Sequence, residues 1–337
     1  MESENPVTLY GLPHIAIEIR ESDFNVLIKD ALVNEYKAIT IEQDGIKKHG
    51  KIRRRGNLSR YFPKPSFNLE VDDEEWHLVA SNIDKSYCRE VFGYNIFMTY
   101  GDFFVPKTKF IALSINNVYQ GLYILREPID EKFFARRKNA EINSLYEIRT
   151  GGRFTFKDGH NSEMDFEKHL PQNSVNYDDL NILISALDKK ENYKIIECIN
   201  EYNIFTYSLI SSVINHHDGI TKNLYIANTK PGNKFEIIPY DLDLTFGIRA
   251  DENFVIPAKL PKFENGLLEQ AEEIFLNGRD REYFKIMIIS YIKRKFEFLD
   301  HLKNEISEAY KNDPYLQDED LDEHIAQIKE YISAIQK

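Results

Sequence analysis

The hydrophobic pattern of the chain changes about a third of the way along. Short runs rich in β-branched and aromatic residues, bounded by turn residues, predict strands in the first part. These runs cover residues 13–19, 36–41, 66–71, 110–115 and 120–127. The last two flank Asn116-Asn117, a dipeptide typical of a tight hairpin turn. One amphipathic helix is predicted among the strands, over residues 87–100, and Gly101 ends it.

After Pro128 the apolar residues recur mainly at helical spacing. Helices are predicted over 131–138, 176–189, 191–200, 202–215, 267–312 and 320–336. A polar loop with three glycines fills 151–159, and two short strands, 223–228 and 234–239, flank a turn at 230–233. We therefore expect an α+β fold of two lobes: a β-rich N-terminal lobe over 1–127 and a mostly helical C-terminal lobe over 128–337.

Composition narrows the class of protein. The 337 residues are 42% hydrophobic and carry 43 basic against 55 acidic side chains, a net charge of −12. This balance excludes a disordered or collagenous chain and argues against a protein that coats nucleic acid. Two cysteines are too few for a disulfide framework, and no secretion signal or apolar membrane-spanning window is visible. We expect a cytoplasmic protein without a membrane span or a nucleic-acid partner.

Polar residues gather at both ends of the short hairpin predicted over 223–239. Asp218 and Asn223 precede its first strand, and Asp241 and Asp243 follow its second. Two paired strands bring their outer ends together, so Asp218, Asn223 and Asp241 can converge. Carboxylate and amide oxygens suit Mg²⁺. The spacing H-x-D-x-x-x-x-N also matches the protein-kinase catalytic loop, whose Asp orients the attacking hydroxyl and whose Asn holds metal. The alternative is that each is an ordinary turn or capping residue.

A second candidate is a basic stretch in the first lobe, over residues 51–67. Arg55, Asn57, Ser59, Arg60 and Lys64 surround a small-residue turn there, against the acidic sign of the whole chain. Guanidinium forks, hydroxyls and backbone N–H groups suit a polyphosphate. The alternative is a charged, solvated edge strand.

Two glutamates complete the comparison with a kinase lobe. Glu90 could fix Lys64, although a surface glutamate in the first turn of a helix is the simpler interpretation. The segment around Glu127 would serve as a hinge whose backbone meets an adenine edge. That placement depends only on order along the chain.

Four motifs occur in a fixed order between about residues 45 and 250. They are R-G-N-x-S-R-x-F-P-K-x-S-F from Arg55, N-N-x-Y-Q-G-L-Y-I-x-x-E-P-I-D from Asn116, H-D-G-x-x-x-N-x-Y from His217, and I-P-Y-D-L-D-x-T-F-G from Ile238. Together they resemble the CotH family of spore coat proteins. The resemblance implies an atypical protein-kinase-like fold that binds ATP and Mg²⁺, with Mn²⁺ as a substitute, and phosphorylates serines of other coat proteins during spore formation.

The resemblance also implies roles for the matched residues. Asp218 is the catalytic-loop aspartate, Asp241 binds metal, and Asn223 is a further metal ligand. Lys64 and Arg60 approach the phosphates. Asp243 either binds a second metal or anchors the loop. The resemblance places the protein in the mother-cell cytoplasm and then in the spore coat, with coat proteins as its substrates.

Two other functions stay open at this point. A kinase-like cleft can also transfer AMP or activate a carboxylate for glutamylation. The chain could instead be a structural scaffold of the coat whose nucleotide site does not turn over.

Overall fold

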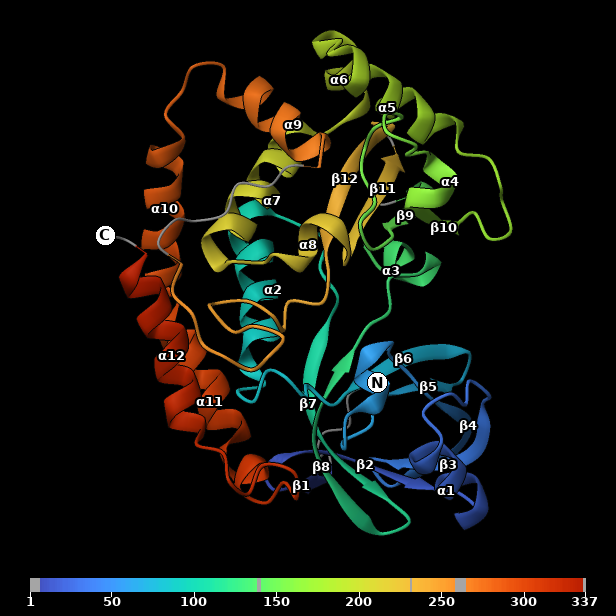
Figure 1. Ribbon diagram of the computed structural model, residues 1–337. Helices are drawn as coiled ribbons and strands as arrows, with labels where there is room; N and C mark the ends of the chain where they lie inside the picture. Colours follow the sequence, from blue (N-terminus) through green and yellow to red (C-terminus); the bar gives the residue numbers. More distant parts are fainter. Residues whose placement is uncertain (1–6, 138–140, 231, 258–264, 336–337) are drawn as a thin grey trace. The chain divides into compact units, whose positions relative to one another are not determined.

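The structure, a computed structural model, describes residues 7–137, 141–230, 232–257 and 265–335 (Figure 1). It forms two compact units. Unit 1 comprises Met1–Cys88, Pro106–Pro128 and Glu297–Ala326, and unit 2 comprises Arg89–Val105, Ile129–Phe296 and Gln327–Lys337. The expected division cut the chain once, after residue 127. The compact units differ from it because contacts between segments distant in sequence, rather than chain order, define them.

Unit 1 contains a sheet that closes on itself. Its strands are β1 (Thr8–Leu9), β2 (Leu12–Glu18), β3 (Lys37–Gln43), β4 (Ile46–Arg54), β5 (Phe67–Val71), β6 (Glu74–Val79), β7 (Thr108–Ile115) and β8 (Val118–Arg126). They follow the order β1-β2-β3-β4-β5-β6-β8-β7, and β2 also pairs with β7 in parallel. Every other pairing is antiparallel. The strands from β2 to β7 therefore form a closed barrel.

The barrel interior is filled by inward-facing apolar side chains. Ile15, Ile39 and Leu113 are among those that lie at 5% exposure or less. Helix α1 (Glu21–Lys29) adds Leu27 to this core, and the short 3₁₀ helix η1 (Leu58–Tyr61) follows β4. The β7–β8 hairpin is confirmed as predicted, because Asn116 and Asn117 both adopt positive φ angles, 50° and 62°.

Unit 2 contains a four-stranded antiparallel sheet in the order β10-β9-β11-β12. Its strands are β9 (Glu141–Ile148), β10 (Phe166–Leu170), β11 (Leu224–Lys230) and β12 (Lys234–Pro239). The predicted β11–β12 hairpin is confirmed, although position 231 of its turn lies outside the described residues. β9 and β10 were not predicted. β10 has only five residues and its register shifts between Lys168 and Leu170, and β9 buries the three consecutive residues 144–146, so neither strand shows a clean alternation.

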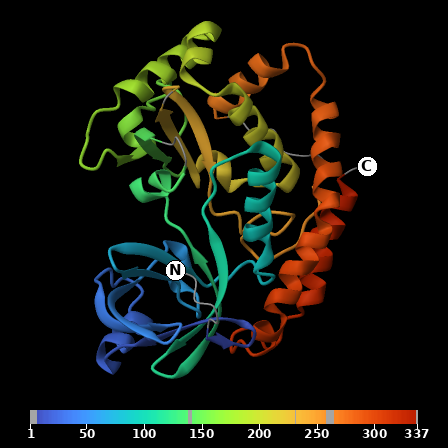
Figure 2. The same ribbon diagram turned by 180° about the vertical axis from the view of Figure 1, so that it is seen from behind.

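Helices surround this sheet (Figures 1 and 2). They are α2 (Cys88–Gly101), α3 (Glu131–Ala135), α4 (Ser162–Asp165), α5 (Asp178–Lys189), α6 (Asn192–Cys198), α7 (Glu201–Ile214), α8 (Asp218–Thr221), α9 (Leu267–Leu276) and α10 (Arg281–Arg294). α7 is buried from Asn203 to Ile214 and packs against α9, α10 and β12. The ring of Tyr207 on α7 stacks on Phe97 of α2 at 5.5 Å between centroids. α7 is thus the central helix of unit 2.

The C-terminal helices are α11 (Phe296–Lys311) and α12 (Leu321–Ala334). Asp320 caps the last helix, because its carboxylate accepts the N–H of Asp322 at 2.9 Å. Two expected helix ends, residues 138 and 336, lie outside the described residues. None of the helices in the described ranges is long and apolar enough to cross a membrane.

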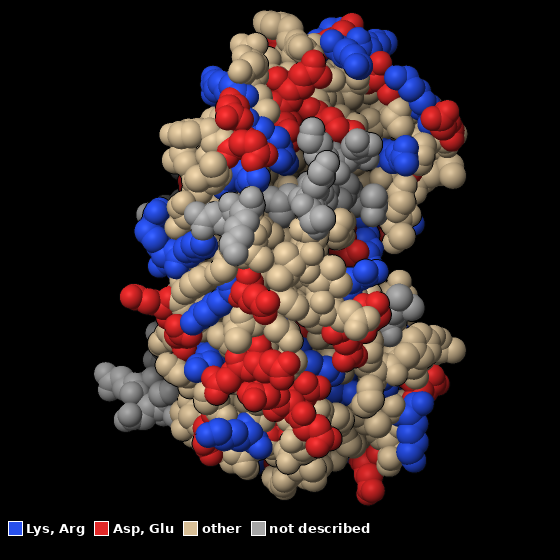
Figure 3. Space-filling model, turned by 60° about the vertical axis from the view of Figure 1, so that its left-hand side comes forward, with Lys and Arg blue, Asp and Glu red and all other residues tan. Residues whose placement is uncertain are grey.

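The surface reflects the net charge of −12. Acidic side chains form a broad continuous area on the face shown in Figure 3. Two cations of the basic stretch, Arg54 and Lys64, lie inside unit 1 at 4% and 2% exposure. That stretch therefore presents less positive charge than the sequence suggests.

Candidate functional site

The segment that carries Asp218 begins where α7 ends. Asn215 takes a left-handed conformation, φ 61°, and its N–H closes the helix on the carbonyls of Ser211 and Ser212. The chain then turns into the four-residue helix α8, whose first residue is Asp218. The carboxylate of Asp218 lies 2.8 Å from the Lys222 ammonium, at the i,i+4 spacing. Lys222 was not singled out from the sequence, although that spacing was visible there.

The β11–β12 hairpin brings two predicted metal ligands together. Leu224 pairs with Pro239, so Asn223, one residue before this pair, and Asp241, two residues after it, become neighbours. The amide of Asn223 donates to Oδ2 of Asp241 at 3.1 Å. Both residues have positive φ angles, 55° and 59°, so the chain turns sharply just before β11 and just after β12. Asp243 follows in the same loop and is half-buried.

This donor set fits a hard divalent cation. The amide nitrogen of Asn223 lies 3.1 Å from Oδ2 of Asp241, and a half-turn of the amide group would present its oxygen beside the carboxylate instead. Mg²⁺ in nucleotide sites uses one or two carboxylates with waters and phosphate oxygens. Within the described ranges, no group of three or more His, Cys, Asp or Glu residues could hold a metal ion. The pair therefore resembles a site completed by a bound phosphate rather than an all-protein cage.

A buried histidine, His216, lies two residues before Asp218 in the segment between α7 and α8. His216 has 0% exposure, and neither ring nitrogen finds a hydrogen-bond partner among the described residues. Burial lowers the pKa of His216 to about 4, with the Asp241 carboxylate acting in the opposite direction, so the imidazole is neutral at pH 7. A Cβ at Gly219 would lie 2.2 Å from the His216 ring, so glycine is required at that position.

The loop after β4 in unit 1 holds four of the residues predicted to bind phosphate. Gly56 has φ +104°, and a Cβ there would lie 1.9 Å from Oγ of Ser59. Asn57 is exposed, while Arg55, Ser59 and Arg60 are half-buried. The Arg60 guanidinium donates to the Gly56 carbonyl at 2.6 Å and to Asn34 at 3.0 Å. Much of its donor capacity therefore serves the shape of the loop.

Arg54 fixes the same loop from inside. Its guanidinium donates to the carbonyls of Ile28, at 2.7 Å, and Leu27, at 3.1 Å, and also to that of Arg60. Because β4 pairs with both β3 and β5, the alternative of a solvated edge strand is wrong. The sequence showed the arginines but not which of them turns inward.

Lys64 lies in a buried node of unit 1. Its ammonium donates to Tyr87 Oη at 2.7 Å, to the Leu122 carbonyl at 2.6 Å and to Asp313 Oδ2 at 2.6 Å. These three bonds use its three donors. Burial lowers the pKa of Lys64 to about 8, opposed by Asp313, and the ammonium stays charged at pH 7. Contact with a phosphate, as predicted, would require one of these bonds to open.

Asp313 was missed because nothing in the sequence links it to position 64, 249 residues earlier. It also accepts the backbone N–H of Leu122 at 2.7 Å and that of Tyr315 at 2.9 Å. A Cβ at Gly121 would fall 2.3 Å from its carboxylate, so the strand must carry glycine there.

Two glutamates lie differently from the expectation. Glu90, interpreted as a surface residue, is 1% exposed and accepts the hydroxyl of Tyr94, so that interpretation is wrong. Glu127 is also buried. Its N–H donates to the Lys107 carbonyl at 2.9 Å, and its carboxylate accepts the Lys107 N–H at 3.1 Å. The hinge role of Glu127 stays a prediction.

The family resemblance inferred from the four sequence motifs is confirmed by a family match. The chain matches the family described as CotH kinase protein over residues 52–337. The chain belongs to this family.

The chain is also similar to one curated protein and to one solved structure. The chain is 23% identical over 259 residues to the inner spore coat protein H of Bacillus subtilis (strain 168), with 70% of each chain covered. The crystal structure of the Helicobacter pylori proinflammatory kinase CtkA is 10% identical, and the match covers 80% of this chain and 90% of that one, with a TM-score of 0.35.

In this CotH-family chain a pocket of about 300 Å³ adjoins Asp218. Leu244, Ile248 and Ala250 supply its apolar lining, and Arg249 supplies a charge. The Arg249 guanidinium lies 3.9 Å from the Asp251 carboxylate. A pocket of this size can receive a side chain or a short peptide segment next to the carboxylate.

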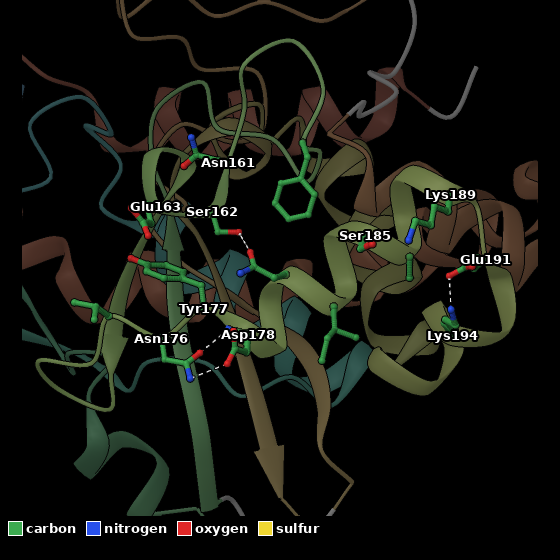
Figure 4. A pocket seen from close by; sticks show the side chains of 15 residues that line it. Asn161, Ser162, Glu163, Asn176, Tyr177, Asp178, Ser185, Lys189, Glu191 and Lys194 are labelled. Carbon is green, nitrogen blue, oxygen red and sulfur yellow. Dashed lines mark hydrogen bonds and ion pairs between the residues drawn. The ribbon is translucent and has the colours of Figure 1, made fainter.

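A wider groove of about 1450 Å³ lies elsewhere in unit 2, along the outer side of α5 (Figure 4). Ser162, Asn181 and Ser185 line it, and Lys194 pairs with Glu191 at its end. The groove contains none of the predicted site residues. The groove therefore has no part in the proposed phosphoryl transfer.

Proposed function

We propose that the protein transfers the γ-phosphoryl group of ATP, with Mg²⁺ or Mn²⁺, to serine residues of spore coat proteins. The proposal rests above all on one observation, the convergence of Asn223 and Asp241 across the mouth of the β11–β12 hairpin. Membership of the CotH kinase family supports the kinase chemistry. The spore coat as the setting is suggested by the name of the Bacillus subtilis relative.

Asp218 would act on the acceptor. Its carboxylate orients the serine hydroxyl and takes its proton while the serine oxygen bonds to the γ-phosphorus and the bond to the leaving ADP oxygen breaks. Lys222, at 2.8 Å, holds one oxygen of that carboxylate in place. The pocket beside Asp218 would admit the acceptor segment.

Asn223 and Asp241, with Asp243 as a further candidate, would hold Mg²⁺. Bound there with ATP, the cation would neutralise charge on the phosphates. Within unit 1, the loop with Arg55, Asn57, Ser59 and Arg60 offers backbone N–H groups and cations that suit a polyphosphate, and Glu127 is the candidate for contact with the base. Lys64 would hold this part of unit 1 together through Asp313.

The test uses ATP labelled at either the γ- or the α-phosphate, Mg²⁺ and a coat-protein extract. The wild type should transfer γ-label, and Asp218→Asn and Asp241→Asn should lose it. Asp322→Asn, whose carboxylate is 80% exposed on α12, is the matched control and should label normally. Transfer of α-label would indicate AMP transfer instead, and full γ-label with both site variants would refute the assignment.

A further inference from the structure

Three consecutive residues of α2 contact the loop that carries Asp241. The ring of Phe92 packs on that of Phe246 at 5.4 Å between centroids. Gly93 faces Leu242 so closely that a Cβ on it would lie 2.8 Å from the leucine side chain. Tyr94 reaches Asp241 itself. The helix therefore supports the loop at its beginning and at its end.

The hydroxyl of Tyr94 accepts one hydrogen bond and donates another. Its hydroxyl oxygen accepts the backbone N–H of Asp241 at 3.1 Å. The same hydroxyl donates its proton to Oε1 of Glu90, one turn earlier on α2, at 3.0 Å. A hydroxyl that gives its proton to a carboxylate presents its lone pairs to the other partner, so the two bonds support each other.

The hydrogen bond between the Asp241 N–H and Tyr94 lies at a strained position of the backbone. Asp241 adopts φ 59°, a left-handed conformation that costs energy for any residue with a Cβ, although aspartate tolerates it better than most. The carboxylate is held from another side by Asn223. Glu90 and Tyr94 are both nearly fully buried, at 1% and 2% exposure, so water does not compete for these bonds.

We infer that Tyr94 and Glu90 are positioning residues for the metal site. They hold the backbone of Asp241 in the conformation that directs its carboxylate toward Asn223. This inference depends on the proposed function, because it assumes that Asp241 binds the cation. Neither residue touches the metal or the reacting atoms in this account.

The test measures Mn²⁺ on the protein by water-proton relaxation enhancement, in the presence of a non-hydrolysable ATP analogue. Tyr94→Phe keeps the ring and removes both bonds. It should weaken Mn²⁺ binding about fivefold to tenfold, the equivalent of one lost hydrogen bond to a buried group. In activity assays the apparent KM for Mg²⁺ should rise by the same factor, and kcat at saturating Mg²⁺ should stay near the wild-type value.

Tyr146→Phe is the matched control. Tyr146 is a fully buried tyrosine of β9 whose hydroxyl also bonds a carboxylate, Asp179 at 2.5 Å, away from the metal loop. This variant should bind Mn²⁺ like the wild type. Gly93→Ala perturbs the loop through Leu242 instead and should also weaken Mn²⁺ binding, which keeps the inference testable should Tyr94→Phe fold poorly.

Asp241→Asn separates this inference from the proposed function. Loss of Mn²⁺ binding in Asp241→Asn together with wild-type binding in a folded Tyr94→Phe would overturn the positioning role and leave the metal site standing. Wild-type Mn²⁺ binding in Asp241→Asn would overturn the metal site itself, and with it the basis of this inference.

Discussion

Replacing Lys64 by methionine separates two roles for this lysine. Methionine keeps most of the side chain's length and removes the charge. If Lys64 contacted phosphate directly, Lys64→Met would leave a stable protein that binds ATP poorly. If Lys64 instead serves the buried node, the variant should lose stability.

The size of that loss follows from the partners. Lys64 and Asp313 have side chains at 3% and 0% exposure, and the substitution would leave the Asp313 carboxylate buried without its cation. Breaking one partner of such a pair costs about 3–5 kcal/mol. For a unit of this size that corresponds to a fall in melting temperature on the order of 10 °C.

The assay is thermal and urea unfolding followed by circular dichroism, with hydrogen exchange of the β8 and 313–321 peptides as a local readout. Lys51→Met is the control, because Lys51 forms a comparable pair with Glu70 at 2.8 Å but is 53% exposed. Because an exposed ion pair contributes little to stability, Lys51→Met should leave the unfolding midpoint close to the wild-type value. If the unfolding midpoint and the hydrogen-exchange rates of Lys64→Met were the same as in the wild type, Lys64 would not stabilise unit 1 through the buried node.

Two further predictions concern the segment around Asp218. Gly219→Ala should lower kcat and cost about 1–3 kcal/mol, because its Cβ would lie 2.2 Å from His216 and 2.4 Å from Tyr207 Oη. Gly232→Ala, whose Cβ would meet only Lys234 at 4.0 Å, should be neutral, and normal activity of Gly219→Ala would contradict the packing. The folded-state pKa of His216, about 4, lies below its ordinary 6.5, so the unfolded chain binds the proton first and stability falls as pH drops from 6.5 toward 4. Urea unfolding should show a loss of about 3 kcal/mol between pH 7 and pH 4 that is absent in His216→Leu, and equal losses in both proteins would count against it.

The local elements were readable from the sequence where one face is buried and a turn has a clear signature. The β7–β8 hairpin with Asn116-Asn117 and the polar ends of the β11–β12 hairpin are such cases. The closure of the barrel could not be predicted from the sequence, because it depends on parallel pairing of residues 14–17 with 112–115. No local pattern encodes that pairing.

The same limit applies to the candidate site. The spacing of Asp218, Asn223 and Asp241 was visible because they flank one hairpin. The partners of Lys64 and Asp241 were not, because Asp313 and Tyr94 meet them only through the fold, at separations of 249 and 147 residues. Charge patterns likewise could not show that Arg54 and Glu90 point inward, since burial of a charge depends on partners distant in sequence.

We propose phosphoryl transfer to serine by a site to which Asp218, Asn223 and Asp241 contribute. Its most direct test is identification of phosphoserine on coat proteins by mass spectrometry after incubation with Mg²⁺ and ATP carrying ¹⁸O in the γ-phosphoryl group. The wild type should yield ¹⁸O-labelled phosphoserine, and Asp218→Asn should yield none. Labelled phosphoserine at the wild-type level with Asp218→Asn, or AMP attached in its place, would contradict it.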